Sequence, residues 1–293
     1  MLDAVVRYVG EHDSSRLDET MELFIGRAFV VARGVTDRSV GIAMDYGQYQ
    51  AESSSGARRV AVGMASEILA PGWSIDNCSA ETASSLRVAV VSAMCRPFFS
   101  RESLESAGLR SVSMSYSEMY DIRPGHEHPI VDCVADALSD NATAAVVGFG
   151  NNLEVLAFDP RIKSVVVADR HFASRRITID RVVASLNRSI GYEKVKFVGS
   201  DSSQLNDVDV IDITASSLCN SSIEELLRID ASVRILTGPS GAVAPAPLVD
   251  AGIDLIVTEL RRPDFPEIYI ENEHLVRFFD EYDTRLCIMR ANV

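Results

Sequence analysis

Short, continuous apolar runs alternate with amphipathic stretches from about residue 143 to residue 260. Continuous apolar runs bounded by Gly, Pro or Asp are typical of strands buried on both faces, whereas apolar residues at intervals of three and four indicate helices. The predicted strands are 144–150, 163–170, 194–201, 207–215, 233–241 and 253–260, and the predicted helices are 128–140, 151–160, 175–191, 221–230 and 244–252. This alternation predicts right-handed βαβ crossovers and a doubly wound, mostly parallel sheet of Rossmann-like α/β type.

The first part of the chain has a different pattern. Residues 23–47 predict two strands around the turn "RGVTDRS", and 80–99 carries apolar residues at helical spacing. Residues 100–129 are polar and read as a connecting region. We therefore expect a smaller α+β domain at 1–125 and a Rossmann-like, ligand-binding domain at 126–293.

Net charge, hydropathy and cysteine content indicate which kinds of partner and compartment to expect. The formal net charge of −14 argues against a nucleic-acid surface, which needs clustered Lys and Arg. We find no basic start followed by an apolar run and no window of 18 apolar residues, so we expect a cytoplasmic protein that does not bind membranes. Five scattered cysteines without a CxxC pair are typical of reduced thiols.

A glycine turn follows the first strand of the alternating part. Gly148 and Gly150 stand at its carboxyl end, and Asn151 and Asn152 follow them. Parallel sheets bind ligands at this edge, and glycine lets the backbone approach a ligand closely. Leu153 occupies the place of the third glycine of a dinucleotide fingerprint, so the pattern does not favour NAD.

Two acids follow the next two strands. Asp169 ends the second apolar run, 19 residues after Gly150, where a carboxylate can accept both hydroxyls of a ribose. Asp201 ends the third strand, where it can accept from the exocyclic amine of adenine, with the backbone at Ser202 facing the ring. The turn and the two acids together predict a cradle for adenosine.

The stretch "VVGFG…VVVADR…VKFVGSDSSQL…DVDVIDITA" resembles the class I S-adenosylmethionine-dependent methyltransferases over residues 143–218. The resemblance implies S-adenosylmethionine as cofactor or substrate, with Thr214 beside it after strand four. This chain has no motif of the N-P-P-Y type there, and "DITASSLCN" stands in its place. That departure argues against methylation of a base or a protein amine and leaves a small molecule as the expected substrate.

A second resemblance covers about residues 25–265. "ITASSLCNSSIEELL" and "RILTGPSGAVAPAPLVDAGIDLIVTEL" are similar to a heavy-metal chelation family of Rossmann-like proteins, which carry a smaller N-terminal domain. The resemblance implies the fold more than the chemistry. The cleft residues that it implies are Thr214, Ser216, Ser217, Asn220, Gly238, Pro239 and Ser240.

We expect an enzyme that uses the sulfonium of S-adenosylmethionine as an alkyl donor. Tyr116 and Tyr120 are candidates to face the sulfonium. Ser216, Ser217 and Asn220 are candidates to orient the reacting amine and carboxylate. One possibility is an intramolecular cyclisation that releases methylthioadenosine, as azetidine-2-carboxylate synthases perform, and another is methyl transfer to a small molecule.

The competing interpretation is a non-catalytic protein that holds a metal or a metal chelate. His126 and His128 form an HxH motif with Cys133 five residues on, a pattern that can bind one ion. Pro129 follows directly and no second cluster exists, so we interpret these as ordinary histidines and expect no metal site here. Apolar strands in the N-terminal part make a homodimer plausible.

Overall fold

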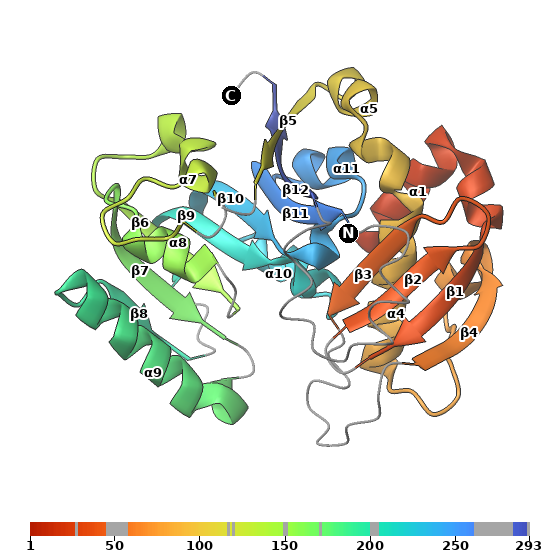
Figure 1. The fold of residues 1–293 in the computed structure, drawn as a ribbon, viewed down its shortest axis with the longest axis horizontal. Coiled ribbons are helices and arrows are strands. Elements are labelled where there is room, and N and C mark those ends of the chain that lie inside the picture. Colours follow the sequence, from red (N-terminus) through yellow and green to blue (C-terminus); the bar gives the residue numbers. More distant parts are fainter. Residues whose placement is uncertain are drawn as a thin grey trace.

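The computed structural model describes residues 1–26, 29–44, 58–115, 118, 121–148, 152–169, 172–199, 205–260 and 284–291. Two sheets organise these residues, as Figure 1 shows. The larger has the order β5-β12-β11-β10-β9-β6-β7-β8, and the smaller has the order β3-β2-β1-β4. The predicted class, a mostly parallel α/β sheet with a smaller second unit, is confirmed.

The large sheet is parallel over most of its width. Its parallel strands are β6 (Ala142–Val147), β7 (Ile162–Ala168), β8 (Val195–Phe197), β9 (Val208–Thr214), β10 (Ala231–Thr237) and β11 (Leu255–Leu260). All six fall within the predicted strand segments or overlap them, because all but the short β8 are mainly buried apolar runs. The sequence reading missed β12 (Thr284–Arg290), which pairs antiparallel with β11.

Helices cover both faces of this sheet. One face is packed by α7 (Pro129–Asp132), α8 (Asn152–Phe158) and α9 (Phe172–Ile190). The other is packed by η5 (Ala215–Leu218), α10 (Ile223–Leu226), η6 (Pro239–Gly241) and α11 (Pro245–Asp250). The segment predicted as one helix at 128–140 is instead α7 followed by η3 (Ala135–Ala137).

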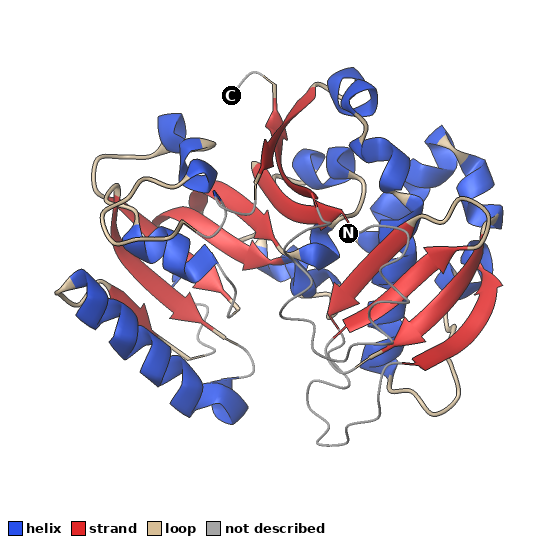
Figure 2. Ribbon diagram, viewed as in Figure 1, coloured by secondary structure: helices blue, strands red, loops and turns tan. Residues whose placement is uncertain are grey.

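The small sheet is antiparallel and packs on one long helix (Figure 2). Its strands are β1 (Thr20–Ile25), β2 (Phe29–Gly34), β3 (Val40–Met44) and β4 (Arg58–Met64). Helix α4 (Ala80–Met94) begins at Ser79, whose side chain accepts from the Thr82 backbone N–H at 3.1 Å. A β-carbon on Gly41 would lie 2.0 Å from the Ala89 carbonyl oxygen, so β3 lies directly against α4. The predicted helix at 80–99 ends at Met94, and η2 (Arg96–Phe99) follows.

The two sheets share one hydrophobic core. Val5 and Val9 of α1 (Leu2–His12), most of α4 and the α11 face of the large sheet form a single buried cluster. The remaining short helices are η1 (Ser14–Asp18), α3 (Ala65–Leu69) and α5 (Arg101–Ser106). The small unit is therefore packed firmly against the large sheet.

The predicted connecting region at 100–129 contains regular structure. Helix α5 lies in it, and so does β5 (Leu109–Met114), which pairs antiparallel with β12. The large sheet thus takes its edge strand from residues before the expected boundary at 125. The division of the chain into 1–125 and 126–293 stays a prediction.

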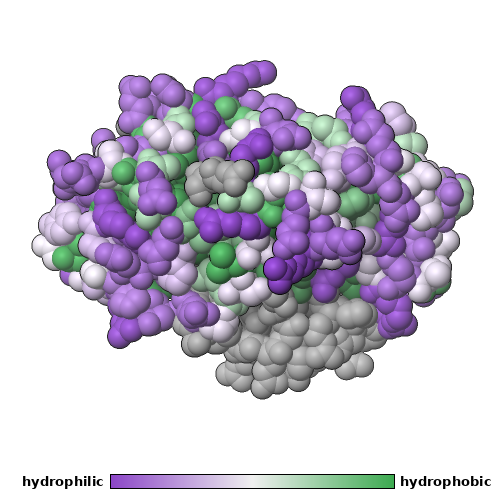
Figure 3. Space-filling view, turned by 90° about the horizontal axis from the view of Figure 1, so that it is seen from above, coloured by the Kyte–Doolittle hydropathy of each residue, from purple (hydrophilic) through white to green (hydrophobic). Residues whose placement is uncertain are grey.

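Hydrophilic side chains dominate the face in Figure 3, with small apolar areas between them. Among the described residues, five large apolar side chains are exposed: Val62 and Met64 share strand β4, and Val35, Val112 and Tyr192 lie apart from them in the sequence. In the part of the chain that the structure describes, no helix combines the length and the apolar character that a membrane crossing requires.

Candidate functional site

The strand order of the large sheet reverses between β6 and β9. The chain runs outward from β6 to β7 and β8, then returns to β9 on the opposite side of β6 and continues to β10 and β11. Crossovers leave this point in opposite directions, and in doubly wound sheets such a point, at the carboxyl ends of the strands, is where the ligand-binding crevice lies. Gly148 and Thr214 meet there.

Gly148 satisfies a requirement of the protein's own backbone. Its φ is +88°, and an added β-carbon would lie 2.4 Å from Cγ2 of Thr214. Both the conformation and the space therefore demand glycine. The Gly148 N–H donates to the Ala168 carbonyl at 2.8 Å, which holds the turn against the end of β7.

Asp169 lies where the sequence placed it, directly after β7. Its backbone N–H donates to the Gly199 carbonyl at 2.8 Å, so it is tied to the segment that follows β8, two residues beyond the strand. The residue is only 3% exposed. A ligand therefore has to displace its present surroundings to reach the carboxylate.

A buried polar network lies beneath the glycine turn. The Thr237 hydroxyl at the end of β10 donates to Oδ1 of Asp212 at 2.6 Å, and it accepts from Nδ2 of Asn152 at 2.7 Å. Asn152 is the first residue of α8 and is 1% exposed. Among the described residues, its Oδ1 has no hydrogen-bond donor. The network thus ends on an unused acceptor.

The serines predicted to orient a substrate lie on η5. The Ser216 and Thr214 hydroxyls are 3.0 Å apart, so these two predicted residues are brought together. Ser217 is buried, and its hydroxyl has no partner in the described part of the chain. The Asn220 side chain is engaged locally, because its Oδ1 accepts from the backbone N–H and hydroxyl of Ser222.

Six of the predicted site residues lie outside the described residues. They are Tyr116, Tyr120, Gly150, Asn151, Asp201 and Ser202. Their places in the site remain predictions.

Ser240 links this edge to the small sheet. Its hydroxyl accepts from the Met44 backbone N–H at 3.1 Å, at the end of β3. Gly238 before it has a φ of +124°, and Pro239 begins η6. The turn after β10 therefore joins the two sheets, which adds a second role to the cleft residues that the sequence implied.

His128 has a local structural role. It is buried, and its Nδ1 accepts from the Ile130 backbone N–H at 3.2 Å, which caps α7. Within the described ranges, no group of three or more His, Cys, Asp and Glu side chains could hold an ion. The expectation of no metal at the HxH motif stays a prediction.

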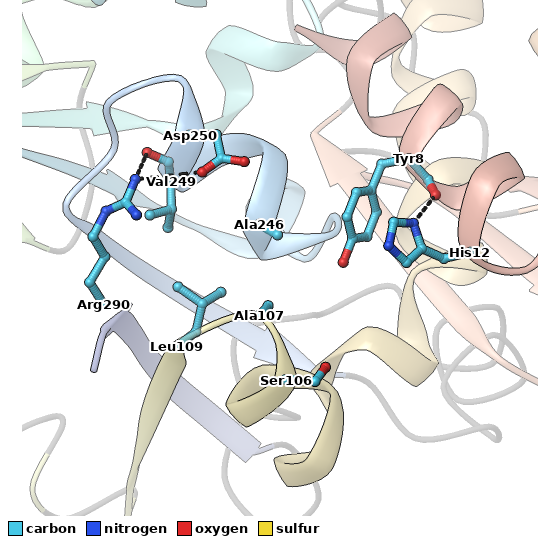
Figure 4. Close-up of a pocket in the computed structure, with 9 residues that line it drawn as sticks. All are labelled: Tyr8, His12, Ser106, Ala107, Leu109, Ala246, Val249, Asp250 and Arg290. Carbon is cyan, nitrogen blue, oxygen red and sulfur yellow. Dashed lines mark hydrogen bonds and ion pairs between the residues drawn. The ribbon is translucent and has the colours of Figure 1, made fainter. Parts of the chain in front are cut away.

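A cavity of 260 Å³ lies elsewhere, between α1, α5, α11 and the end of β12 (Figure 4). Tyr8 and His12 stack on one side, with ring centroids 4.0 Å apart. Arg290 lines the other side, paired with Asp250 at 3.5 Å. The lining includes none of the residues predicted to bind a nucleoside, so the cavity is separate from the crevice.

The sequence pattern did not single out Asp212 or Thr237 as site residues. An acid in the middle of the apolar run "VDVIDIT" was the available signal, because a buried carboxylate needs a hydrogen-bonding partner. Its partner lies 25 residues away, on the next strand.

Comparison with known families found one match. The model of the DUF364 family, described as "Putative heavy-metal chelation", matches residues 138–262. A search of curated proteins found no match.

A crystal structure of a DUF364-family protein of unknown function from Pyrococcus horikoshii is similar over 98% of this chain and 99% of its own, with a TM-score of 0.61 and 15% identity. A precorrin-6y C5,15-methyltransferase from Geobacter metallireducens matches 54% of this chain and 84% of its own, with a TM-score of 0.34 and 15% identity. An rRNA methylase from Streptococcus thermophilus matches 56% of this chain and 95% of its own, with a TM-score of 0.30 and 14% identity.

The first of these structures shows that the whole architecture, both sheets included, occurs in another protein. At 15% identity it says nothing about chemistry. The methyltransferase likenesses are too slight to carry an argument, so a function has to be argued from the crevice itself.

Proposed function

We propose that the crevice between β6 and β9 binds S-adenosylmethionine and that the protein is an enzyme that uses its sulfonium as an alkyl donor. The observation that carries the proposal is the placement of Gly148 and Asp169. They end two adjacent parallel strands, β6 and β7, at the point where the strand order reverses. A glycine turn and a carboxylate in these places are suited to a nucleoside and its ribose.

The polar network beneath the turn supports a cationic ligand. The Oδ1 of Asn152 has no donor among the described residues and can accept one, and the Asp212 carboxyl group is linked to Asn152 through Thr237. An ammonium group supplies donors and the complementary charge. The amino-acid end of S-adenosylmethionine carries such a group.

When bound, the sulfonium would supply an electrophilic carbon, either its methyl group or the carbon of its own amino-acid chain. The second case gives azetidine-2-carboxylate and methylthioadenosine from one substrate. Thr214 and Ser216 would hold the turn after β9, and Ser217 would offer its free hydroxyl to the reacting amine or carboxylate. The chain's task is to position and to exclude water.

Calorimetry with S-adenosylmethionine, S-adenosylhomocysteine and methylthioadenosine tests the binding. In Asp169→Asn, loss of charge-assisted hydrogen bonds worth about 1.5–3 kcal/mol each should weaken binding by about 100-fold. Asp209→Asn is the matched control. Asp209 is the second residue of β9. It accepts from Thr143 and Ser139 at the amino ends of the strands, opposite the proposed site. Unchanged affinity in Asp169→Asn would remove that residue from the site.

Mass spectrometry distinguishes the two reactions. Methylthioadenosine formed from enzyme and S-adenosylmethionine alone supports cyclisation. S-adenosylhomocysteine formed only when an acceptor is added supports methyl transfer. Absence of binding to all three nucleosides would overturn the proposal.

A second candidate function is non-catalytic binding of a metal or metal chelate in the same crevice. The description of the matching family model favours it. The neutral hydroxyls and the buried carboxylate there would bind a chelate through its polar groups. Elemental analysis of the purified protein and of its Asp212→Asn variant tests this candidate, which is rejected if metal content is negligible or the same in both.

A further inference from the structure

Three sulfur atoms meet on the face of the large sheet that α7 covers. The Cys287 thiol on β12 lies 3.4 Å from the Met114 thioether at the end of β5, with its hydrogen directed at it. Cys133, directly after α7, is hydrogen-bonded to Cys287. Neither cysteine forms a disulfide, and Cys287 and Met114 are buried.

The sheet register explains why these side chains converge. Cys287 pairs with Val112, and Arg285 pairs with Met114, so Cys287 and Met114 are diagonal neighbours on one face of an antiparallel pair. The end of α7 then places Cys133 over the same face, where all three join one apolar cluster. Residues from three distant parts of the sequence thus supply one set of soft ligands.

The surroundings favour an ion of low charge and low coordination number. Arg110 and Asp132 act on Cys133 in opposite electrostatic directions. The neighbouring carboxylate of Asp132 is held by Arg161 at 2.7 Å, so it is engaged elsewhere. Structural zinc is almost always bound by four ligands, whereas thiolate and thioether sulfurs select Cu(I).

We propose that Cys133, Cys287 and Met114 form a binding site for a soft monovalent metal ion, Cu(I) by preference. The site is separate from the crevice between β6 and β9 and does not depend on what binds there. Binding forms three metal–sulfur bonds and releases the two thiol protons to solvent, with no change in oxidation state. Cys133 is half-buried and provides the entry path from solvent.

The required adjustment is small. With metal–sulfur bonds of about 2.3 Å, trigonal coordination places the sulfurs about 4 Å apart, so Cys287 and Met114 must separate by roughly half an ångström. The thioether side chain of methionine adapts to such changes by rotation. The separation of the Cys287 and Met114 sulfurs is therefore close to the one that the bound ion requires.

Anaerobic titration of the full chain with Cu(I), in competition with a chromophoric Cu(I) chelator, tests the proposal. We expect one tightly bound ion per chain and an X-ray absorption spectrum with three sulfur neighbours. Because even outer-shell partners of metal sites are worth about 10–100-fold in affinity, Cys133→Ser should weaken binding by at least about 100-fold, and Met114→Leu by about tenfold. Ag(I) should bind the same site, since it is also soft and monovalent.

Cys78→Ser is the matched control, because Cys78 is another half-buried free thiol and lies outside the cluster. It should leave the affinity unchanged. The proposal is overturned if no Cu(I) is retained against the chelator, if Cys133→Ser and Met114→Leu bind as the parent does, or if the two cysteines form a disulfide in air and the reduced protein takes up no metal. If Cys133→Ser loses Cu(I) but still binds nucleosides, the metal site and the proposed function are independent. Metal bound in the crevice is best measured in that variant, because the sulfur site then contributes little.

Discussion

Thr214 occupies the space that a side chain on Gly148 would need. The two residues end neighbouring strands, and the calculated separation of 2.4 Å between a new β-carbon and Cγ2 of Thr214 is far below a van der Waals contact. The glycine turn is thus specified by the sheet itself, whatever ligand it binds.

Gly148→Ala should lower the free energy of unfolding by about 2–4 kcal/mol, because a positive φ and an overpacked contact each cost about 1–3 kcal/mol. Thr214→Ser removes Cγ2 and should recover the steric part in the double variant. Urea unfolding of the four proteins in this cycle measures the coupling. Strict additivity would show that the contact does not limit residue 148.

Thr237→Val should destabilise the protein more than Thr258→Val. Both threonines are buried at neighbouring strands, but the Thr237 hydroxyl donates to a carboxylate, whereas that of Thr258 donates to the Gly238 carbonyl at 3.1 Å. Hydrogen bonds to charged groups are worth about 1.5–3 kcal/mol, against about 1 for neutral ones. Denaturant midpoints compare the variants, and equal losses would mean that the bond from Thr237 to Asp212 is worth no more than the bond from Thr258 to a backbone carbonyl.

The Asp159 carboxylate should increase the free energy of unfolding near neutral pH, and this contribution should be lost in acid. Burial would raise its pKa, but hydrogen bonds from the Arg161 side chain, the Arg161 N–H and the His128 N–H hold it below its usual value. A folded pKa below the unfolded value of about 3.9 gives stability that is present above that pH and is lost as the pH falls through the folded pKa.

Asp159→Asn should therefore be clearly less stable than the parent at pH 7, and the difference should shrink below about pH 4. Asp132→Asn is the control, since that carboxylate also binds Arg161 but is 53% exposed at its side chain. Its effect should be small at every pH. A constant difference between parent and Asp159→Asn down to pH 2 would contradict the assignment.

The Cys95 thiol should be inert in the folded protein. It is buried, and burial raises its pKa to about 12, despite a hydrogen bond from the Ala244 N–H and the charge of Arg16. Since the thiolate is the reactive form, alkylation at pH 8 should spare Cys95 and reach it only after unfolding. Peptide mass spectrometry identifies the modified cysteines, and rapid native labelling of Cys95 would refute its burial.

The parallel strands could be predicted because each is a short apolar run between turn residues, as in "AAVVGFG" and "KSVVVADR". Strand β5 could not, because four of its six residues are exposed and it shows no clean alternation. Its existence depends on β12, more than 160 residues later, which supplies the hydrogen bonds. Local pattern says nothing about such a partner.

The site divides in the same way. Asp169 was predictable from its place at a strand end, and the structure puts it there. The conflict between Gly148 and Thr214 and the network joining Asn152 to Thr237 arise from strand order, which the sequence pattern does not reveal. Asn220 was chosen by motif, but the short turn to Ser222 uses its amide locally.

The position of β5 outside β12 has a consequence for synthesis on the ribosome. Strand β12 lies between β11 and β5, so residues 109–114 have no described strand partner until residues 284–290 have been made. The small sheet and strands β6 to β11 can form earlier as the chain emerges, N-terminal parts first. Until β12 is made, the backbone hydrogen-bonding groups along β11 and β5 have no strand partner on that side. A nascent chain halted before residue 284 would therefore expose both strand edges to other chains.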